Sequence, residues 1–211
     1  KNKMFILDMY IVYLFRLKAL MRGDIVLRQI LGEIEEELLT LEDDLTYWVD
    51  TNIELIRQPL KDMILSGGKR LRPAMVLAAS RFGNYDFENV RQLAVSVELI
   101  HMATLIHDDI IDDSPLRRGI PSIQARLGKD VAVFAGDFVF CKVFELFALS
   151  EHFSLLRIVA KTLHLICEGE IKQREDLFNT NLTFKDYLYR IRRKTAMLFA
   201  LSAELGARAS K

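Results

Sequence analysis

Three aspartates at the end of one apolar segment are the residues in this sequence best suited to chemistry. Asp108 and Asp112 lie four residues apart in the stretch HDDIIDDSPLRRG, with Asp109 beside them. In a helix, positions four apart project within about 40° of each other. Carboxylates gathered in this way would repel one another without a cation, and hard oxygen ligands suit Mg²⁺. The spacing therefore favours a magnesium site, and a solvated acidic helix end is the alternative.

Basic and imidazole side chains flank these carboxylates. Arg117 and Arg118 follow directly, and His101 lies seven residues before Asp108, about two helical turns back on the same face. Because arginine binds phosphate oxygens with two parallel hydrogen bonds, carboxylates, a metal and paired arginines together form a diphosphate site.

A second cluster of positive charge lies earlier, in the stretch SGGKRLRP at residues 66–73. Its two glycines suit the end of one helix, and Pro73 suits the first turn of the next. Lys69, Arg70 and Arg72 therefore crowd a loop that enters a helix N-terminus, where free N–H groups favour an anion. The stretch is not a P-loop, because the spacing of that motif is absent. A solvated basic loop is the alternative.

A third cluster begins the segment RIRRKTAMLFALSAELGA at residues 190–207. Lys194 and Thr195 stand at the start of an otherwise apolar helical stripe, where they could hold another phosphate. A solvated first helical turn is the alternative for this cluster.

The elements that must position these residues are helical. Apolar residues recur at three- and four-residue spacing, only ten glycines and four prolines interrupt the chain, and no alternating strand pattern is evident. We expect one all-α domain, with helices over residues 4–21, 24–41, 43–66, 73–82, 87–112, 122–127, 129–149, 154–173, 183–189 and 190–209.

Composition excludes several classes of protein. Lysine plus arginine equals aspartate plus glutamate, 29 against 29, so nothing suggests nucleic-acid binding by overall charge. The apolar stretch within residues 1–18 is too short to span a bilayer, which leaves at most a peripheral membrane contact. Cys141 and Cys167 have no metal-ligand spacing, and we interpret them as reduced core thiols of a cytoplasmic protein.

The order of these clusters resembles the trans-isoprenyl diphosphate synthase family. The matching segments are GGKRLRP at 67–73, HMATLIHDDIIDDSPLRRG at 101–119, GD at 136–137, GEIKQ at 169–173 and KTAMLF at 194–199. The resemblance covers residues 27–211 and implies an isoprenoid synthase-type helical bundle around a central cavity. We expect an extension helix over residues 1–24 and the polyprenyl synthase domain over residues 25–211.

The resemblance also implies roles for individual residues. Asp108 and Asp112 would ligate Mg²⁺, with Asp109 assisting, and the metal would hold an allylic diphosphate. The same diphosphate would contact Arg117, Lys194 and Thr195, with Gln173 nearby. The second substrate, isopentenyl diphosphate, would be held by Lys69, Arg72, His101 and Arg118.

Product length follows from positions near the aspartates. Family members that stop at short products carry bulky aromatic residues just before the aspartate motif. Here Ala103 and Thr104 stand five and four residues before Asp108. Small residues imply a deeper tunnel, so we expect a long-chain polyprenyl product.

The sequence departs from the family pattern at one point, because no second aspartate-rich motif occurs among the 211 residues. We expect the domain to be incomplete at its C-terminal end, and these residues alone to bind diphosphate weakly and turn over poorly or not at all. A regulatory subunit of the same fold remains an alternative, although both DDxxD and GGKR are intact.

Other functions fit the sequence less well. A terpene cyclase would not need the second basic cluster, and a di-iron bundle would need Glu-x-x-His pairs that the chain lacks. For assembly we expect a homodimer, with a heteromer as the alternative, through the apolar segment 131–149.

Overall fold

The computed structural model of the protein describes residues 25–211, and these residues are almost entirely helical. The chain forms two compact units, residues 1–36 and 37–211. The elements are α2 (Ile25–Trp48), α3 (Glu54–Leu65), α4 (Leu71–Ser80), α5 (Phe87–Ile111), β1 (Leu116–Arg117), β2 (Ile120–Pro121), α6 (Ile123–Leu127), α7 (Lys129–Leu149), a short 3₁₀ turn η1 (Phe153–Leu155), α8 (Leu156–Glu175), α9 (Phe184–Ile191), a π-helical turn η2 (Arg192–Ala196) and α10 (Met197–Ala209). The all-α prediction is confirmed.

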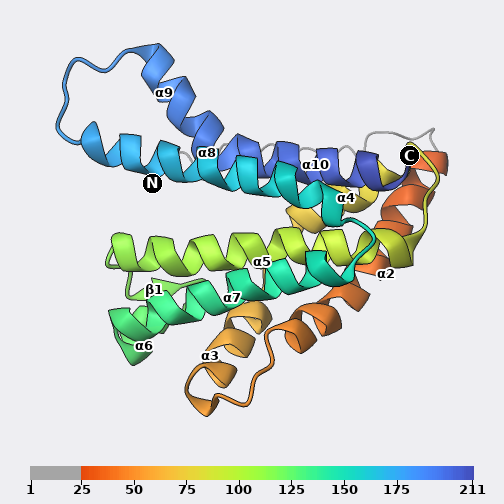
Figure 1. The fold of residues 1–211 in the computed structure, drawn as a ribbon, viewed down its shortest axis with the longest axis horizontal. Helices are drawn as coiled ribbons and strands as arrows, with labels where there is room; N and C mark the ends of the chain where they lie inside the picture. The colour runs from red at the N-terminus through yellow and green to blue at the C-terminus, as the bar shows by residue number, and fades with distance from the viewer. Residues whose placement is uncertain (1–24) are drawn as a thin grey trace. The chain divides into compact units, whose positions relative to one another are not determined.

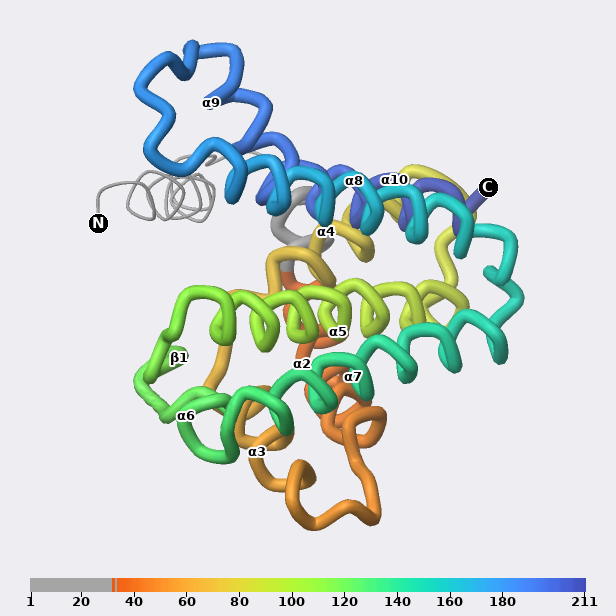
Figure 2. Tube along the Cα trace, turned by 60° about the vertical axis from the view of Figure 1, so that its left-hand side comes forward, coloured from red at the N-terminus to blue at the C-terminus, as the bar shows by residue number. Residues whose placement is uncertain are grey.

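The core of the second unit lies around α5, which packs against α7 along its length and against α4 (Figure 1). Most apolar side chains of α5 are buried, including Leu93, Leu99 and Ile106. Helix α10 packs closely on α4, because a Cβ at Gly206 would collide with the carbonyl oxygen of Val76. Figure 2 shows α8 and α10 side by side, with α9 beyond their ends. Helix α5, which carries the aspartates, therefore packs between α7 and the pair formed by α4 and α10.

The predicted helix boundary near residue 42 is wrong, because α2 continues to Trp48. Leu41, Leu45 and Val49 are all buried and repeat every four residues, so the apolar stripe runs past the predicted boundary. The chain leaves the helix only at residues 49–53.

A small antiparallel hairpin, which the sequence pattern did not predict, follows α5. β1 pairs with β2 through Leu116 opposite Pro121 and Arg117 opposite Ile120. Its two central residues, Arg118 and Gly119, both have positive φ, as type I′ hairpin turns require. The RRG sequence thus fixes the directions of two arginines.

The cysteine prediction is also wrong, since Cys141 and Cys167 are exposed. Cys141 lies on α7, which is apolar nearly all round, so its sequence pattern could not reveal which face is buried. Phe134 and Phe144 of the same helix are exposed as well.

The extension helix predicted within residues 1–24 lies outside the described residues. Within residues 25–211, no helix combines the length and apolar character needed to cross a membrane.

Candidate functional site

The C-terminal end of α5 carries two carboxylates without a salt bridge. Asp108 is half-buried, Asp112 is the exposed C-cap residue, and neither pairs with a cation within 4 Å among residues 25–211. Burial raises the pKa of Asp108 above its usual value; the positive charge of Lys194 opposes this change, and Glu170 and Asp112 add to it. Asp108 and Asp112 therefore carry negative charge that no salt bridge within the described residues neutralises.

Asp109 has a different environment from its neighbours. It is buried, with 3% of its surface exposed, and both of its carboxylate oxygens accept hydrogen bonds from Arg117. Since it lies about 100° round the helix from Asp108, it projects from a different part of α5. In the structure, Asp109 positions Arg117.

His101 lies at the centre of the positive charge. Desolvation is the largest cause that lowers its pKa, and together with the nearby positive charges of Arg72, Arg118, Arg117 and Arg70 it brings the pKa to about 3. The imidazole is therefore neutral at physiological pH.

Two arginines beside His101 lack carboxylate partners. Neither Arg72 nor Arg118 forms a salt bridge among the described residues, and the buried Nε of Arg72 has no hydrogen-bond acceptor. The guanidinium of Arg72 lies over the ring of Phe199, 4.7 Å from its centroid. Because buried donors are normally paired, the Nε of Arg72 is free to donate to an acceptor outside the described residues.

The basic loop between α3 and α4 is held by Arg118 and by Arg70. Arg118 donates from Nη1 to the carbonyl oxygen of Gly67, and a Cβ at Gly68 would come within 3.0 Å of the same guanidinium. Arg70 instead turns inward, to Glu42, Glu98 and the carbonyl of Ile64. Lys69, by contrast, is exposed.

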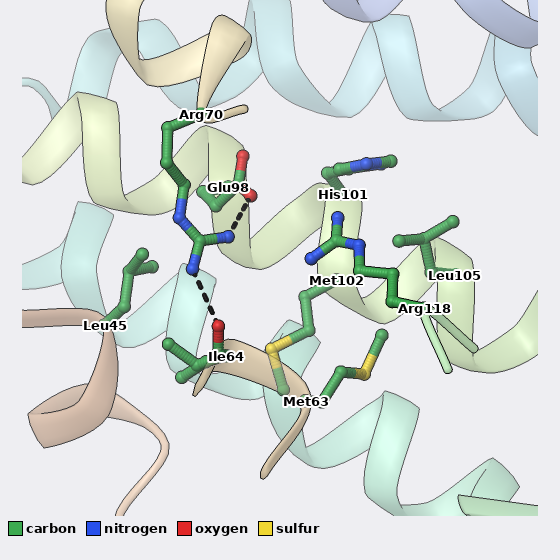
Figure 3. Close-up of a pocket in the computed structure, with 9 residues that line it drawn as sticks. All are labelled: Leu45, Met63, Ile64, Arg70, Glu98, His101, Met102, Leu105 and Arg118. Atoms are coloured by element: carbon green, nitrogen blue, oxygen red, sulfur yellow. Dashed lines mark hydrogen bonds and ion pairs between the residues drawn. The ribbon is translucent and has the colours of Figure 1, made fainter. Parts of the chain in front are cut away.

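A small pocket closes beneath this cluster. It is lined by Leu45, Met63, Ile64, Arg70, Glu98, His101, Met102, Leu105 and Arg118 (Figure 3). Its free volume, about 10 Å³, is roughly that needed for one water molecule. The pocket itself is therefore too small for a phosphate group.

The third predicted cluster lies on the π-helical turn η2. Lys194 reaches across to α8, where both carboxylate oxygens of Glu170 accept hydrogen bonds at 3.1 Å. Thr195 is half-buried on the same turn, and Gln173 is half-buried on α8. Turns of this kind occur mostly at functional sites. The turn passes close to α8 because Gly169 leaves room for Arg193.

The two predicted chain-length positions occupy different faces of α5. Thr104 is four residues before Asp108 and so shares its face, and its hydroxyl donates to the carbonyl of His101 at 2.8 Å. Ala103 is fully buried and shares its face with His107, whose ring contacts the α7 carbonyl of Val133. Only Thr104 lies on the side of the aspartates.

Sequence reasoning missed three carboxylates that hold the cationic residues. Glu42 and Glu98 bind Arg70, and Glu170 binds Lys194. Glu98 lies three residues before His101, so helical spacing could have placed it on the same face. Glu170 lies inside the GEIKQ segment, but its partner comes from a distant helix, which no local pattern reveals.

No group of three metal-binding side chains is already assembled among residues 25–211. Asp108 and Asp112 offer two carboxylates on one face, which suits an ion that keeps several of its own waters and binds ligand oxygens.

A family model described as Polyprenyl synthetase matches residues 53–211. The chain belongs to the polyprenyl synthetase family. It is 41% identical over 177 residues to heptaprenyl diphosphate synthase component 2 of Geobacillus stearothermophilus, covering 84% of this chain and 55% of that protein. The resemblance drawn from the clusters is thereby confirmed.

Solved structures agree with this assignment. The heptaprenyl diphosphate synthase of Staphylococcus aureus matches with a TM-score of 0.80 and 36% identity, over 84% of this chain and 57% of that one. A polyprenyl synthase of Caulobacter crescentus, complexed with calcium and isoprenyl diphosphate, matches with a TM-score of 0.81 and 35% identity, over 90% and 58% of the two chains. The fold is therefore of the isoprenoid synthase type, and the chain spans about half the length of the curated relatives that it matches.

Proposed function

We propose that this protein transfers prenyl groups, condensing an allylic diphosphate with isopentenyl diphosphate in the presence of Mg²⁺. The observation that carries the proposal is the pair of unbalanced charge clusters along α5. Arg72 and Arg118 lack acidic partners at one, and Asp108 and Asp112 lack basic partners at the other, among the residues that the structure describes. Two such clusters suit two diphosphates, one bound directly and one bound through a metal.

The basic cluster suits isopentenyl diphosphate. Arg72 and Arg118 supply positive charge around His101, which is neutral and can donate or accept a hydrogen bond, and Lys69 lies in the loop that leads to Arg72. The apolar side chains of Met102 and Leu105 lie next to them in the pocket lining. A diphosphate with a short hydrocarbon tail matches this combination of cationic rim and apolar neighbours.

The acidic cluster suits a metal-bound allylic diphosphate. The half-buried, desolvated carboxylate of Asp108 and the exposed one of Asp112 would hold Mg²⁺, and the Caulobacter relative was solved with calcium and isoprenyl diphosphate. Bound Mg²⁺ supplies positive charge that stabilises a departing diphosphate. Lys194, Thr195 and Arg117 would donate hydrogen bonds to the same diphosphate, and Gln173 lies on the neighbouring α8.

The proposed reaction needs no nucleophilic side chain of the protein. The allylic C–O bond breaks and its electron pair leaves with the diphosphate, which Lys194 and Arg117 stabilise. The double bond of isopentenyl diphosphate then forms the new C–C bond, and a proton passes to the released diphosphate. The basic cluster holds the second substrate in place for this step.

The direct test is incubation of the protein with labelled isopentenyl diphosphate, an allylic diphosphate and Mg²⁺, followed by extraction of labelled polyprenyl products. Label in an apolar product, formed slowly at most by these residues alone and lost on chelation of the metal, is the expected result. A protein that binds neither substrate would contradict the proposal.

The product is proposed to be a long-chain polyprenyl diphosphate, because Thr104 leaves the aspartate face of α5 without a bulky side chain. Thr104→Phe should shorten the product. Ala103→Phe should instead destabilise the fold, since Ala103 is fully buried on the His107 face. Chromatography of the dephosphorylated products measures the length, and equal shortening by both substitutions would contradict the assignment of Thr104.

A subunit role is the second candidate function, favoured by the name of the Geobacillus relative, a component 2. The exposed Phe134 and Phe144 of α7 offer apolar surface to a homodimer or a heteromer. Light scattering gives the oligomeric state, and activity that appears only with a second, different chain would favour the subunit role. We propose a cytoplasmic location with at most a peripheral membrane contact.

A further inference from the structure

The charge of Arg70, in the basic loop, is engaged inside the protein. Its side chain is 8% exposed, and it donates from Nε and Nη2 to the two carboxylate oxygens of Glu42, at 2.6 and 2.8 Å. It also donates from Nη1 to Glu98 at 2.8 Å and from Nη2 to the carbonyl of Ile64 at 2.9 Å. Figure 3 shows the guanidinium directed toward Glu98 and Ile64.

These contacts join several elements at one point. Glu42 belongs to α2, Ile64 to α3 and Glu98 to α5, while Arg70 itself is the N-cap residue of α4. The backbone of Arg70 has a φ of 43°, in the left-handed region that a residue with a Cβ rarely adopts. Such a conformation persists only where surrounding contacts hold it.

The backbone conformation of Arg70 affects the directions of its neighbours in the loop. Lys69 precedes it, and Arg72 lies in the first turn of α4, so the direction of both side chains depends on how the chain turns at residue 70. Glu98 acts at a longer range too, since its charge opposes the lowering of the Arg72 pKa that burial causes.

We propose that Arg70 is a positioning residue: without touching a ligand, it fixes the turn that aims Lys69 and Arg72 at the diphosphate of isopentenyl diphosphate. This inference rests on the proposed function for the identity of the ligand. The fixed turn is a property of the protein alone and is tested separately.

Arg81 provides a matched control. It lies at the opposite, C-cap end of α4, about 16 Å away along the helix, and its side chain is 9% exposed. It also pairs with a carboxylate of α2, Glu37, at 2.8 Å. Arg81→Met therefore removes a comparable ion pair from the same helix without changing the basic loop.

The test compares Arg70→Met, Arg70→Lys and Arg81→Met with the unmodified protein. Calorimetry measures the dissociation constant of isopentenyl diphosphate, and hydrogen exchange measures protection of residues 66–72. Arg70→Met should weaken binding by about 10- to 100-fold, because a misdirected binding group loses most of its effect. It should also increase exchange in the loop, whereas Arg81→Met should change neither.

Arg70→Lys should recover little of either loss, since one ammonium cannot reach three separate acceptors as a guanidinium does. The inference is contradicted if Arg70→Met leaves loop exchange unchanged, if Arg70→Lys binds as tightly as the unmodified protein, or if Arg81→Met weakens binding equally. If the unmodified protein binds no isopentenyl diphosphate, the proposed function fails, and the exchange comparison still decides whether Arg70 fixes the turn.

Discussion

The basic and the acidic ends of the site have the same arrangement of paired and unpaired charged residues, with opposite signs of charge. At the basic end Arg70 is paired with Glu42 and Glu98, while Arg72 and Arg118 have no salt bridge among residues 25–211. At the acidic end Asp109 is paired with Arg117, whereas the carboxylates next to it in the motif, Asp108 and Asp112, are unpaired within the same residues.

The difference lies in what each paired residue holds. Arg70 holds the loop that carries Lys69 and leads to Arg72, while Asp109 holds an arginine contributed by the hairpin after α5. A motif of like charges is therefore not a set of equivalent ligands. In each cluster one buried member forms an internal ion pair.

Asp108→Asn should have the largest effect, because it removes an unpaired carboxylate proposed to hold the metal. Prenyl transfer should fall by about 10²- to 10³-fold, as when other groups that stabilise departing charge are removed. Steady-state rates at saturating substrate measure it. The matched control is Asp113→Asn at the same helix end, where the carboxylate pairs with Lys129. Equal losses in both variants would contradict the assignment.

Arg72→Met should weaken isopentenyl diphosphate binding by about 30-fold, because it removes a charged donor from a desolvated site. The thermal stability should change little or rise, since Arg72 leaves a buried Nε without an acceptor in the free protein. Calorimetry and thermal denaturation measure the two quantities. A strong loss of stability without a loss of affinity would show that Arg72 is structural.

Asp109→Asn should lower the free energy of unfolding by about 2 kcal/mol, since it leaves the partly exposed Arg117 without its carboxylate. Its effect on the rate should be smaller than that of Asp108→Asn and should come from the released Arg117. Denaturant titration and the same rate assay check this. Full stability in this variant would contradict a stabilising ion pair between Asp109 and Arg117.

His101→Gln should reduce the pH dependence of stability. The pKa of His101 is about 3 in the folded protein and near 6.5 when exposed, so the unfolded chain binds a proton that the folded chain does not. Stability contributed by the neutral imidazole is therefore lost as the pH falls from about 6.5 toward 3. Between pH 7 and pH 5 the unmodified protein should lose about 2 kcal/mol more than the variant. Parallel denaturant titrations that coincide would contradict the burial of a neutral histidine.

The sequence predicts the helical class, most helix positions and the residues of both clusters, because helical periodicity and local motifs are short-range signals. It did not separate Asp109 from Asp108, or Arg70 from Arg72, because the partners that distinguish them lie elsewhere in the chain. Glu42 precedes Arg70 by 28 residues, and Arg117 reaches Asp109 only through the hairpin.

The extent of α2 was mispredicted, and the division between Ala103 and Thr104 stayed open, for a related reason. A helix end was predicted at residue 41, although the buried stripe of Leu41 and Leu45 continues past it. Ala103 and Thr104 are adjacent in sequence, yet consecutive helical positions point about 100° apart. Helical spacing places Thr104 on the face of Asp108, and the structure adds that Ala103 is fully buried on another face.

The most direct test of two separate diphosphate sites is a pair of titrations, with and without Mg²⁺, on the unmodified protein, Arg72→Met and Asp108→Asn. We predict that isopentenyl diphosphate binds without the metal and is weakened only by Arg72→Met. A non-reactive thio-analogue of an allylic diphosphate should require the metal and be weakened by Asp108→Asn. Equal responses of both ligands to both substitutions would contradict the division of the site into a basic and an acidic end.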